Sequence, residues 1–226
     1  MSLGALPHAE EVLAVCAHPD DESFGLGAVL PAFAAQGAKV RVLCFTRGEA
    51  STLGETELSL GEVRAEELRA AACVLGIRDV ELLSYPDGRL ADLPLGELAG
   101  LVEDAIAGAD LLLVFDSGGI TGHPDHCRAT EAALEAANRR RVPVLAWALP
   151  EDVAGRLNTE FATSFVGRGV TDLDITVEVD RELQRAAISC HATQSHDNPV
   201  MRRRLELLGG REYLRWLSCY PGSASA

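Results

Sequence analysis

The chain has 226 residues, enough for one α/β domain with a substantial core. It contains 34 Asp and Glu against 20 Lys and Arg, a formal net charge of -14. Such a charge repels phosphate backbones and anionic membrane surfaces, so we do not expect a nucleic-acid-binding protein. The N-terminal residues do not resemble a signal peptide, and no apolar stretch approaches the roughly 20 residues of a membrane span. We therefore expect a cytoplasmic protein.

Short apolar runs alternate with helical patterns along the first two thirds of the chain. We expect strands at 12–17, 40–45, 80–84, 111–115 and 144–148, and helices near 25–36, 60–75, 95–107 and 125–138. This alternation is typical of βαβ units. It predicts a doubly wound α/β fold whose mostly parallel sheet is covered by helices on both faces.

The pattern is weaker after Pro150. A short helical stretch is followed by a possible strand in "LDITVEV" and by helices near 180–192 and 200–217. Residues 221–226 form a tail that we expect to be disordered. No Ser/Gly/Pro-rich linker divides the chain, so we expect a single domain over residues 1–226.

The first apolar run ends in an unusual cluster of polar residues. The segment "AHPDDE" at 17–22 places a histidine, a proline and three consecutive acids directly after a predicted buried strand. Burying a carboxylate without partners is costly, and crowding three acids together makes each harder to ionise. The cluster therefore predicts a bound cation.

A similar segment, "GHPDH" at 122–126, follows the fourth predicted strand, and Pro124, like Pro19, suits the first position of a helix. In an open α/β sheet, ligands bind beyond the carboxyl ends of the strands, where the strand order reverses. In a 3-2-1-4-5 order this point lies between the first and fourth strands. We therefore expect the polar residues of both motifs to share one crevice. These residues are His18, Asp20, Asp21, His123, Asp125 and His126.

Two imidazoles and a carboxylate suit Zn²⁺, and three protein ligands leave a fourth position for water, as a hydrolytic site requires. His18, Asp21 and one histidine of the second motif meet this requirement. One acid and one histidine then remain for a general base and a general acid. Fe²⁺ or another divalent ion is an alternative, because this ligand set does not identify the metal uniquely.

Together the two motifs resemble those of the LmbE-like, or PIG-L, family of zinc-dependent N-deacetylases. The resemblance extends from the first strand to the helix near residue 190. It implies a Rossmann-like α/β fold and a hydrolase in which a metal-activated water attacks an N-acetyl group. The implied substrate is the N-acetylglucosamine moiety of a small glycoconjugate. The resemblance leaves the aglycone and the formation of a homo-oligomer open.

The resemblance also implies roles for individual residues. The implied metal ligands are His18, Asp21 and His126. Asp20 is the general base, His123 stabilises the oxyanion or protonates the departing amine, and Asp125 orients His123 and holds it charged. Some family members carry a tyrosine two residues before the first histidine of the second motif, where this chain has Thr121. We therefore expect the metal and His123 to be the principal stabilisers of the oxyanion.

Weaker matches at other strand ends suggest substrate-binding residues. Glu49 in "TRGEAS" resembles an acid that family members place near the sugar, and Arg64 falls at the position of a substrate-binding arginine. Asp87 in "YPDG" also fits the family pattern. Arg47, Arg64 and Arg89 are candidates for contact with an anionic aglycone, against the alternative of solvated loop residues.

Two other functions agree with the same motifs. One is an amidase that cleaves a thiol conjugate. The other is a non-catalytic sugar- or metal-binding protein that retains the fold without turnover. A protein that has lost activity is expected to lack the base or a ligand, whereas this chain retains Asp20 and the complete ligand set.

Overall fold

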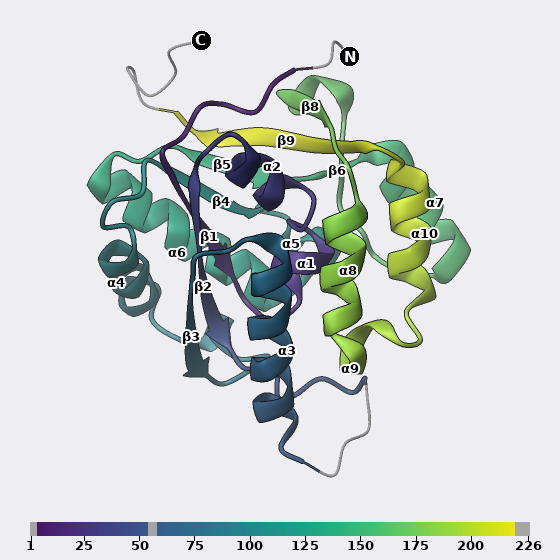
Figure 1. The fold of residues 1–226 in the computed structure, drawn as a ribbon, viewed down its shortest axis with the longest axis horizontal. Coiled ribbons are helices and arrows are strands. Elements are labelled where there is room, and N and C mark those ends of the chain that lie inside the picture. The colour runs from purple at the N-terminus through teal and green to yellow at the C-terminus, as the bar shows by residue number, and fades with distance from the viewer. Residues whose placement is uncertain (1–3, 54–57, 220–226) are drawn as a thin grey trace.

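The computed structural model describes residues 4–53 and 58–219 and is built around a seven-stranded sheet (Figure 1). The strands are β1 (Glu11–Cys16), β2 (Lys39–Thr46), β3 (Asp79–Tyr85), β4 (Leu111–Phe115), β5 (Val144–Trp147), β8 (Ile175–Glu178) and β9 (Arg211–Ser218). Their order is β3-β2-β1-β4-β5-β9-β8. The first five strands pair in parallel, and β9 pairs antiparallel with β5 and β8. The expected 3-2-1-4-5 order and the mostly parallel α/β fold are confirmed.

Helices cover both faces of the sheet (Figure 1). They are α1 (Asp21–Phe24), α2 (Val29–Ala35), α3 (Leu60–Leu75), α4 (Leu95–Ala105), α5 (Gly119–Gly122), α6 (Pro124–Arg140), α7 (Glu151–Phe161), α8 (Glu182–Cys190), α9 (Ala192–Ser195) and α10 (Pro199–Leu208). The shorter elements are η1 (Leu90–Asp92), η2 (Val170–Asp172) and the paired strands β6 (Leu149–Pro150) and β7 (Gly167–Arg168). None of the helices in the described residues is long and apolar enough to span a bilayer.

Successive residues of β1 supply two separate cores, because side chains along a strand alternate between faces. Val12 and Ala14 belong to the core that includes residues of α3 and α8. Leu13 and Val15 belong to the core that includes residues of α4 and α6. Both faces of β1 are buried. Polar side chains can therefore reach a cavity from its carboxyl end.

The structure corrects the expected helix at 200–217. Helix α10 ends at Leu208, and Gly209, with φ 56°, and Gly210 lead directly into β9. Glycine tolerates the positive φ that ends a helix, and the following segment "REYLRWLS" pairs antiparallel with β5 and β8. The helix prediction is therefore wrong for residues 211–217. The tail at 221–226 lies outside the described residues.

Candidate metal centre

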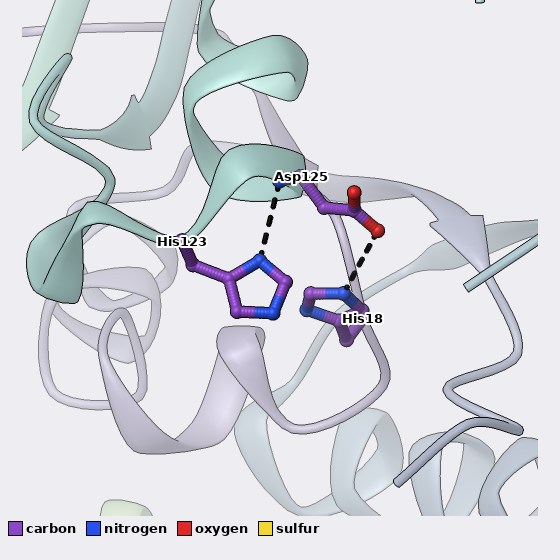
Figure 2. Close-up of side chains that lie close together, drawn as sticks. All are labelled: His18, His123 and Asp125. Atoms are coloured by element: carbon purple, nitrogen blue, oxygen red, sulfur yellow. Dashed lines mark hydrogen bonds and ion pairs between the residues drawn. The ribbon is translucent and has the colours of Figure 1, made fainter. Parts of the chain in front are cut away.

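The two sequence motifs meet at the carboxyl ends of β1 and β4, which are neighbours in the sheet. The imidazole centroids of His18 and His123 are 4.8 Å apart, and those of His18 and His126 are 5.0 Å apart. Figure 2 shows the His18 and His123 rings side by side, with the Asp125 carboxylate turned toward His18. The structure thus brings the motifs together as the strand order predicted.

The backbones of the two motifs differ despite their similar sequences. Pro124 opens α6 as expected, whereas α1 begins at Asp21, two residues after Pro19. Asp20 therefore lies before the helix, with φ 117°. A positive φ in a residue other than glycine costs on the order of 1–3 kcal/mol and is maintained by surrounding contacts. The position of this carboxylate is set by a strained backbone.

Three potential ligand atoms converge between the motifs. His126 Nε2 lies 3.1 Å from His18 Nδ1 and 3.1 Å from Asp21 Oδ1. The other carboxylate oxygen, Asp21 Oδ2, accepts hydrogen bonds from the backbone N–H groups of Ala17 and His18, at 2.9 and 3.0 Å. These bonds fix the carboxylate and leave Oδ1 directed at the histidines.

The remaining ring nitrogens of both histidines already have acceptors. His18 Nε2 lies 3.0 Å from Asp87 Oδ1 and 3.4 Å from Asp125 Oδ2, while His126 Nδ1 lies 3.1 Å from the Gly119 carbonyl oxygen. A neutral imidazole carries one N–H, which these acceptors engage. The two facing nitrogens, His18 Nδ1 and His126 Nε2, then carry lone pairs, and Asp21 Oδ1 is a third acceptor beside them. A divalent cation bound between the three atoms satisfies all of them.

A second convergent set consists of His18, His123 and Asp125. Its lone pairs are already used, because the Asp125 carboxylate accepts from the backbone N–H groups of Gly88 and Leu90 at 2.8 and 3.0 Å. His123 Nδ1 accepts from the Asp125 backbone N–H at 3.2 Å. The donor chemistry therefore favours His18, Asp21 and His126 as the ligands.

The ionisation of this cluster follows from the same contacts. Burial would lower the pKa of His18, but Asp125 and Asp87 raise it to about 10. Burial would raise the pKa of the Asp21 carboxyl, but His126 and His18 hold it well below its usual value. The raised pKa of His18 shows that its carboxylate neighbours favour positive charge at this position.

Arg64 holds the side chain of Asp20. Its Nη2 donates to Asp20 Oδ2 at 2.8 Å and to the Pro19 carbonyl, and its Nη1 donates to the Gly48 carbonyl at 2.7 Å. Burial raises the pKa of Asp20 to about 6, an increase that Arg64 opposes and Asp21 reinforces. Arg64 is only 3% exposed, but it also lines the cavity described below.

Glu22, the third acid of the first motif, holds the backbone of Asp20. Its Oε2 accepts from the Asp20 N–H at 2.9 Å, and its Oε1 accepts from Ser23 Oγ and lies 2.6 Å from His191 Nε2. Both Glu22 and His191 are fully buried. Burial would lower the pKa of His191, but Glu22 raises it above its ordinary value. The junction of α8 and α9 thereby supports the strained residue.

The surroundings of His123 and Asp125 differ from our expectation. The Asp125 backbone, rather than its carboxylate, contacts His123, and the carboxylate is directed to His18. Burial and the neighbouring rings of His126 and His18 lower the pKa of His123. Since Nδ1 accepts a hydrogen bond, the proton of the neutral ring lies on Nε2. His123 is therefore arranged as a neutral donor and not as a charged partner of the Asp125 carboxylate.

The expected substrate-binding residues have structural partners. Glu49 is exposed, and its Oε1 accepts from the Asp87 N–H at 3.0 Å. Asp87 Oδ2 accepts from the Ala50 N–H at 2.9 Å, which leaves Oδ1 beside His18. Arg89, a candidate for an anionic aglycone, is exposed and paired with Asp92. Asp87, like Arg64, lines the cavity described next.

A cavity of about 360 Å³ opens over the cluster. Its floor includes the candidate ligands, and Thr121 lies at its edge beside Ile120, a buried residue with φ 64°. Several apolar or aromatic side chains form its walls: Phe24, Leu53, Phe115, Phe165, Val200 and Met201. Arg204 of α10 also lines it. The sequence did not single out Arg204, because it lies in a run of three arginines that has no local signal of burial.

Comparisons with known proteins agree with this geometry. Residues 13–137 match the family described as PIG-L: GlcNAc-PI de-N-acetylase. The 1D-myo-inositol 2-acetamido-2-deoxy-alpha-D-glucopyranoside deacetylase of Nocardiopsis dassonvillei is 32% identical over 80% of this chain and 83% of its own length. The match to the protein of the same name from Kineococcus radiotolerans, also 32% identical, covers 60% of this chain and 46% of that protein.

Two further comparisons cover nearly the whole chain. The probable N-acetyl-alpha-D-glucosaminyl L-malate deacetylase 2 of Bacillus anthracis is 27% identical over 96% of this chain and 95% of its own length. The zinc-inhibited form of teicoplanin deacetylase Orf2 superposes with a TM-score of 0.70 and 21% identity, covering 91% of this chain and 97% of that one. At this identity the structural match shows a shared fold.

Proposed function

This chain belongs to the PIG-L family, and from that membership and the geometry of its site we propose that it is a zinc-dependent N-deacetylase. The proposed reaction is hydrolysis of the acetamide on the N-acetylglucosamine moiety of a small glycoconjugate. The products are acetate and a free amino sugar.

The observation that carries this proposal is that Asp20 lines the same cavity as three converging atoms of His and Asp side chains. His18, Asp21 and His126 are the proposed ligands, and their facing atoms fit a divalent ion. When bound, Zn²⁺ polarises the acetamide carbonyl and lowers the pKa of a water molecule. The backbone of Asp20 is strained, and Arg64 and Glu22 hold the residue by hydrogen bonds. A non-catalytic binding protein does not require a carboxylate held in this way.

Asp20 is the proposed general base. Arg64 engages its Oδ2, so we assign Oδ1 as the oxygen that accepts the proton of the attacking water. Because burial raises the pKa of Asp20 to about 6, the carboxylate is ionised at neutral pH yet basic enough to take a proton. The same group then delivers that proton to the departing amine.

His123 is the proposed oxyanion donor. Its Nε2–H is free of the Asp125 backbone contact, which lies at Nδ1. A preorganised hydrogen bond to a developing oxyanion lowers the barrier by about 3 kcal/mol. Asp125 and Asp87 are proposed to orient His18 as a ligand through Nδ1, because both carboxylates contact its Nε2.

The names of the relatives support the substrate class. The matched proteins are named for an N-acetylated sugar joined to inositol or L-malate. A small glycoconjugate also suits a cavity of about 360 Å³ whose walls are largely apolar.

Acetate release tests the proposal. The zinc-loaded protein is assayed against a panel of N-acetylglucosaminides and, separately, against thiol-conjugate amides. We expect acetate from the sugar panel and a strongly reduced rate of release after Asp20→Ala. Turnover confined to the conjugates would favour the amidase alternative. Sugar or metal binding without turnover would favour the binding protein.

A further inference from the structure

Arg204 differs from the other buried arginines of the described residues. Three arginines are buried, and two of them donate to buried or half-buried carboxylates, Arg64 to Asp20 and Arg181 to Glu212. Arg204 is 8% exposed, yet within the described ranges no carboxylate oxygen lies within 4.0 Å of its guanidinium nitrogens. Buried charges in proteins are normally paired.

The contacts of Arg204 leave part of its guanidinium unsatisfied. Nη2 donates to the Phe24 carbonyl oxygen at 2.6 Å, and the guanidinium carbon lies 5.3 Å from the centre of the Trp147 ring. Nε is buried and, among the described residues, has no hydrogen-bond partner. Glu212 attracts Arg204, but its two oxygens accept from Arg181 and from Trp147 Nε1.

Arg204 retains its charge in this environment. Burial lowers its pKa to about 10, which still leaves the guanidinium protonated at neutral pH. The residue lines the same cavity as the proposed metal ligands. A ligand entering that cavity therefore meets a desolvated cation with unused hydrogen-bonding capacity, in a protein whose net charge is -14.

Two aromatic rings connect Arg204 to the candidate metal centre through successive contacts. The Phe115 and His126 ring centroids are 5.0 Å apart, the Phe115 and Trp147 centroids are 5.4 Å apart, and Arg204 lies over Trp147. Within the described ranges, Arg204 has no hydrogen bond or ion pair with His18, Asp21 or His126; its contacts are with Phe24 and Trp147. We therefore assign the anion that it would bind to the aglycone rather than to the acetate.

We propose that Arg204 is a specificity residue that binds an anionic group, a carboxylate or phosphate, on the aglycone of the substrate. This inference rests on the proposed deacetylase function. A guanidinium forms strong charge-assisted hydrogen bonds with both kinds of oxyanion, and burial in a low-dielectric pocket strengthens them. The preferred substrate is then an N-acetylglucosaminide with a negatively charged aglycone.

A matched set of substrates tests the inference. N-acetylglucosaminides with 2-hydroxyethyl, carboxymethyl and 2-phosphooxyethyl aglycones differ mainly in charge. Acetate release from each is measured with the zinc-loaded protein and with Arg204→Met, which retains an unbranched side chain without the cation. We expect wild-type kcat/KM to favour at least one anionic substrate by on the order of ten- to hundredfold. Arg204→Met should remove most of that preference through KM.

Arg203→Met is the matched control. Arg203 precedes Arg204 on α10 but is partly exposed and pairs with Glu160 and Glu206. Its loss should leave the ratio of kcat/KM values unchanged. Arg204→Lys, which keeps the positive charge but lacks the planar guanidinium with its paired N–H donors, should retain part of the preference. The kcat/KM values of the two anionic substrates show whether carboxylate or phosphate is the preferred group.

The possible failures are distinguishable. If the wild-type protein hydrolyses the hydroxyethyl glycoside at least as well as both anionic glycosides, the inference is overturned while the deacetylase function stands. An equal loss for all three substrates in a folded Arg204→Met variant also overturns it, because that result indicates a structural role. If no glycoside releases acetate, both proposals fail. The wild-type comparison holds even if Arg204→Met does not fold.

Discussion

His18 Nδ1 and His126 Nε2 face each other at 3.1 Å, although the other nitrogen of each ring is already engaged by an acceptor. Two neutral imidazoles in this arrangement present lone pairs to one another. The contact is favourable only when a proton or a metal ion lies between the rings. This relationship makes the two rings candidate ligands of a shared cation.

Removal of either ring should therefore abolish metal binding. We expect His18→Ala and His126→Ala to lose the bound ion, because two protein ligands hold a divalent cation far more weakly than three. Asp20→Ala should retain the metal and lose roughly 10²- to 10⁴-fold in turnover. Elemental analysis of the purified variants, together with acetate release, checks both outcomes. Full activity in Asp20→Ala would show that another group is the base.

Substitution of Arg64 should change the pH dependence of the reaction. The active form of Asp20 is the carboxylate, so kcat/KM should rise with pH through the pKa of this group. Arg64 lowers that pKa against the effect of burial. In Arg64→Met the acid limb of the kcat/KM profile should therefore move to higher pH, and Arg64→Lys should move it less.

A control for this shift is available on the same helix. Arg69 pairs with Glu66 on the exposed face of α3, and Arg69→Met should leave the profile in place. An unchanged acid limb in Arg64→Met would show that Arg64 does not set the pKa of the base.

Gly48 and Gly76 form a matched pair of positive-φ glycines. A Cβ on Gly48 would lie 2.0 Å from Arg64 Nη1, whereas a Cβ on Gly76 would meet nothing within 4 Å. Both alanine substitutions should cost about 1 kcal/mol of backbone strain. Only Gly48→Ala should also displace Arg64 and lower kcat. Urea unfolding and acetate release on the two variants separate these effects, and equal kcat values would contradict the proposed contact.

The buried pair of Glu22 and His191 should couple stability to catalysis. His191→Ala leaves Glu22 buried with one partner fewer, which costs about 3 kcal/mol of unfolding free energy. A double-mutant cycle with Glu22→Gln should give a coupling energy of about 1–3 kcal/mol. Since Glu22 also holds the Asp20 N–H, Glu22→Gln should lower kcat more than it changes KM. Additive free energies with unchanged kcat would assign the pair a role in packing alone.

Local patterns determined much of the fold. Apolar runs bounded by turns identified the five parallel strands. The general rule for open α/β sheets placed both motifs at the carboxyl ends of two neighbouring strands. The pattern failed at 211–217, where strand pairing with β5 and β8 decides the conformation. The role expected for Asp125 differed for a similar reason. Its carboxylate is captured by the Gly88 and Leu90 N–H groups, which approach only in the folded chain.

The sequence by itself determined which residues are candidates to hold a metal and act as a base, because that chemistry depends on residue types and their spacing along each motif. Only the tertiary structure decided what holds these residues in place. Arg64 from α3 and Glu22 from α1 contact Asp20, and His191, between α8 and α9, contacts Glu22. It also decided that Arg204, alone among three consecutive arginines, is buried against the cavity. Burial and pairing arise from contacts between distant segments, and no local pattern of side chains encodes them.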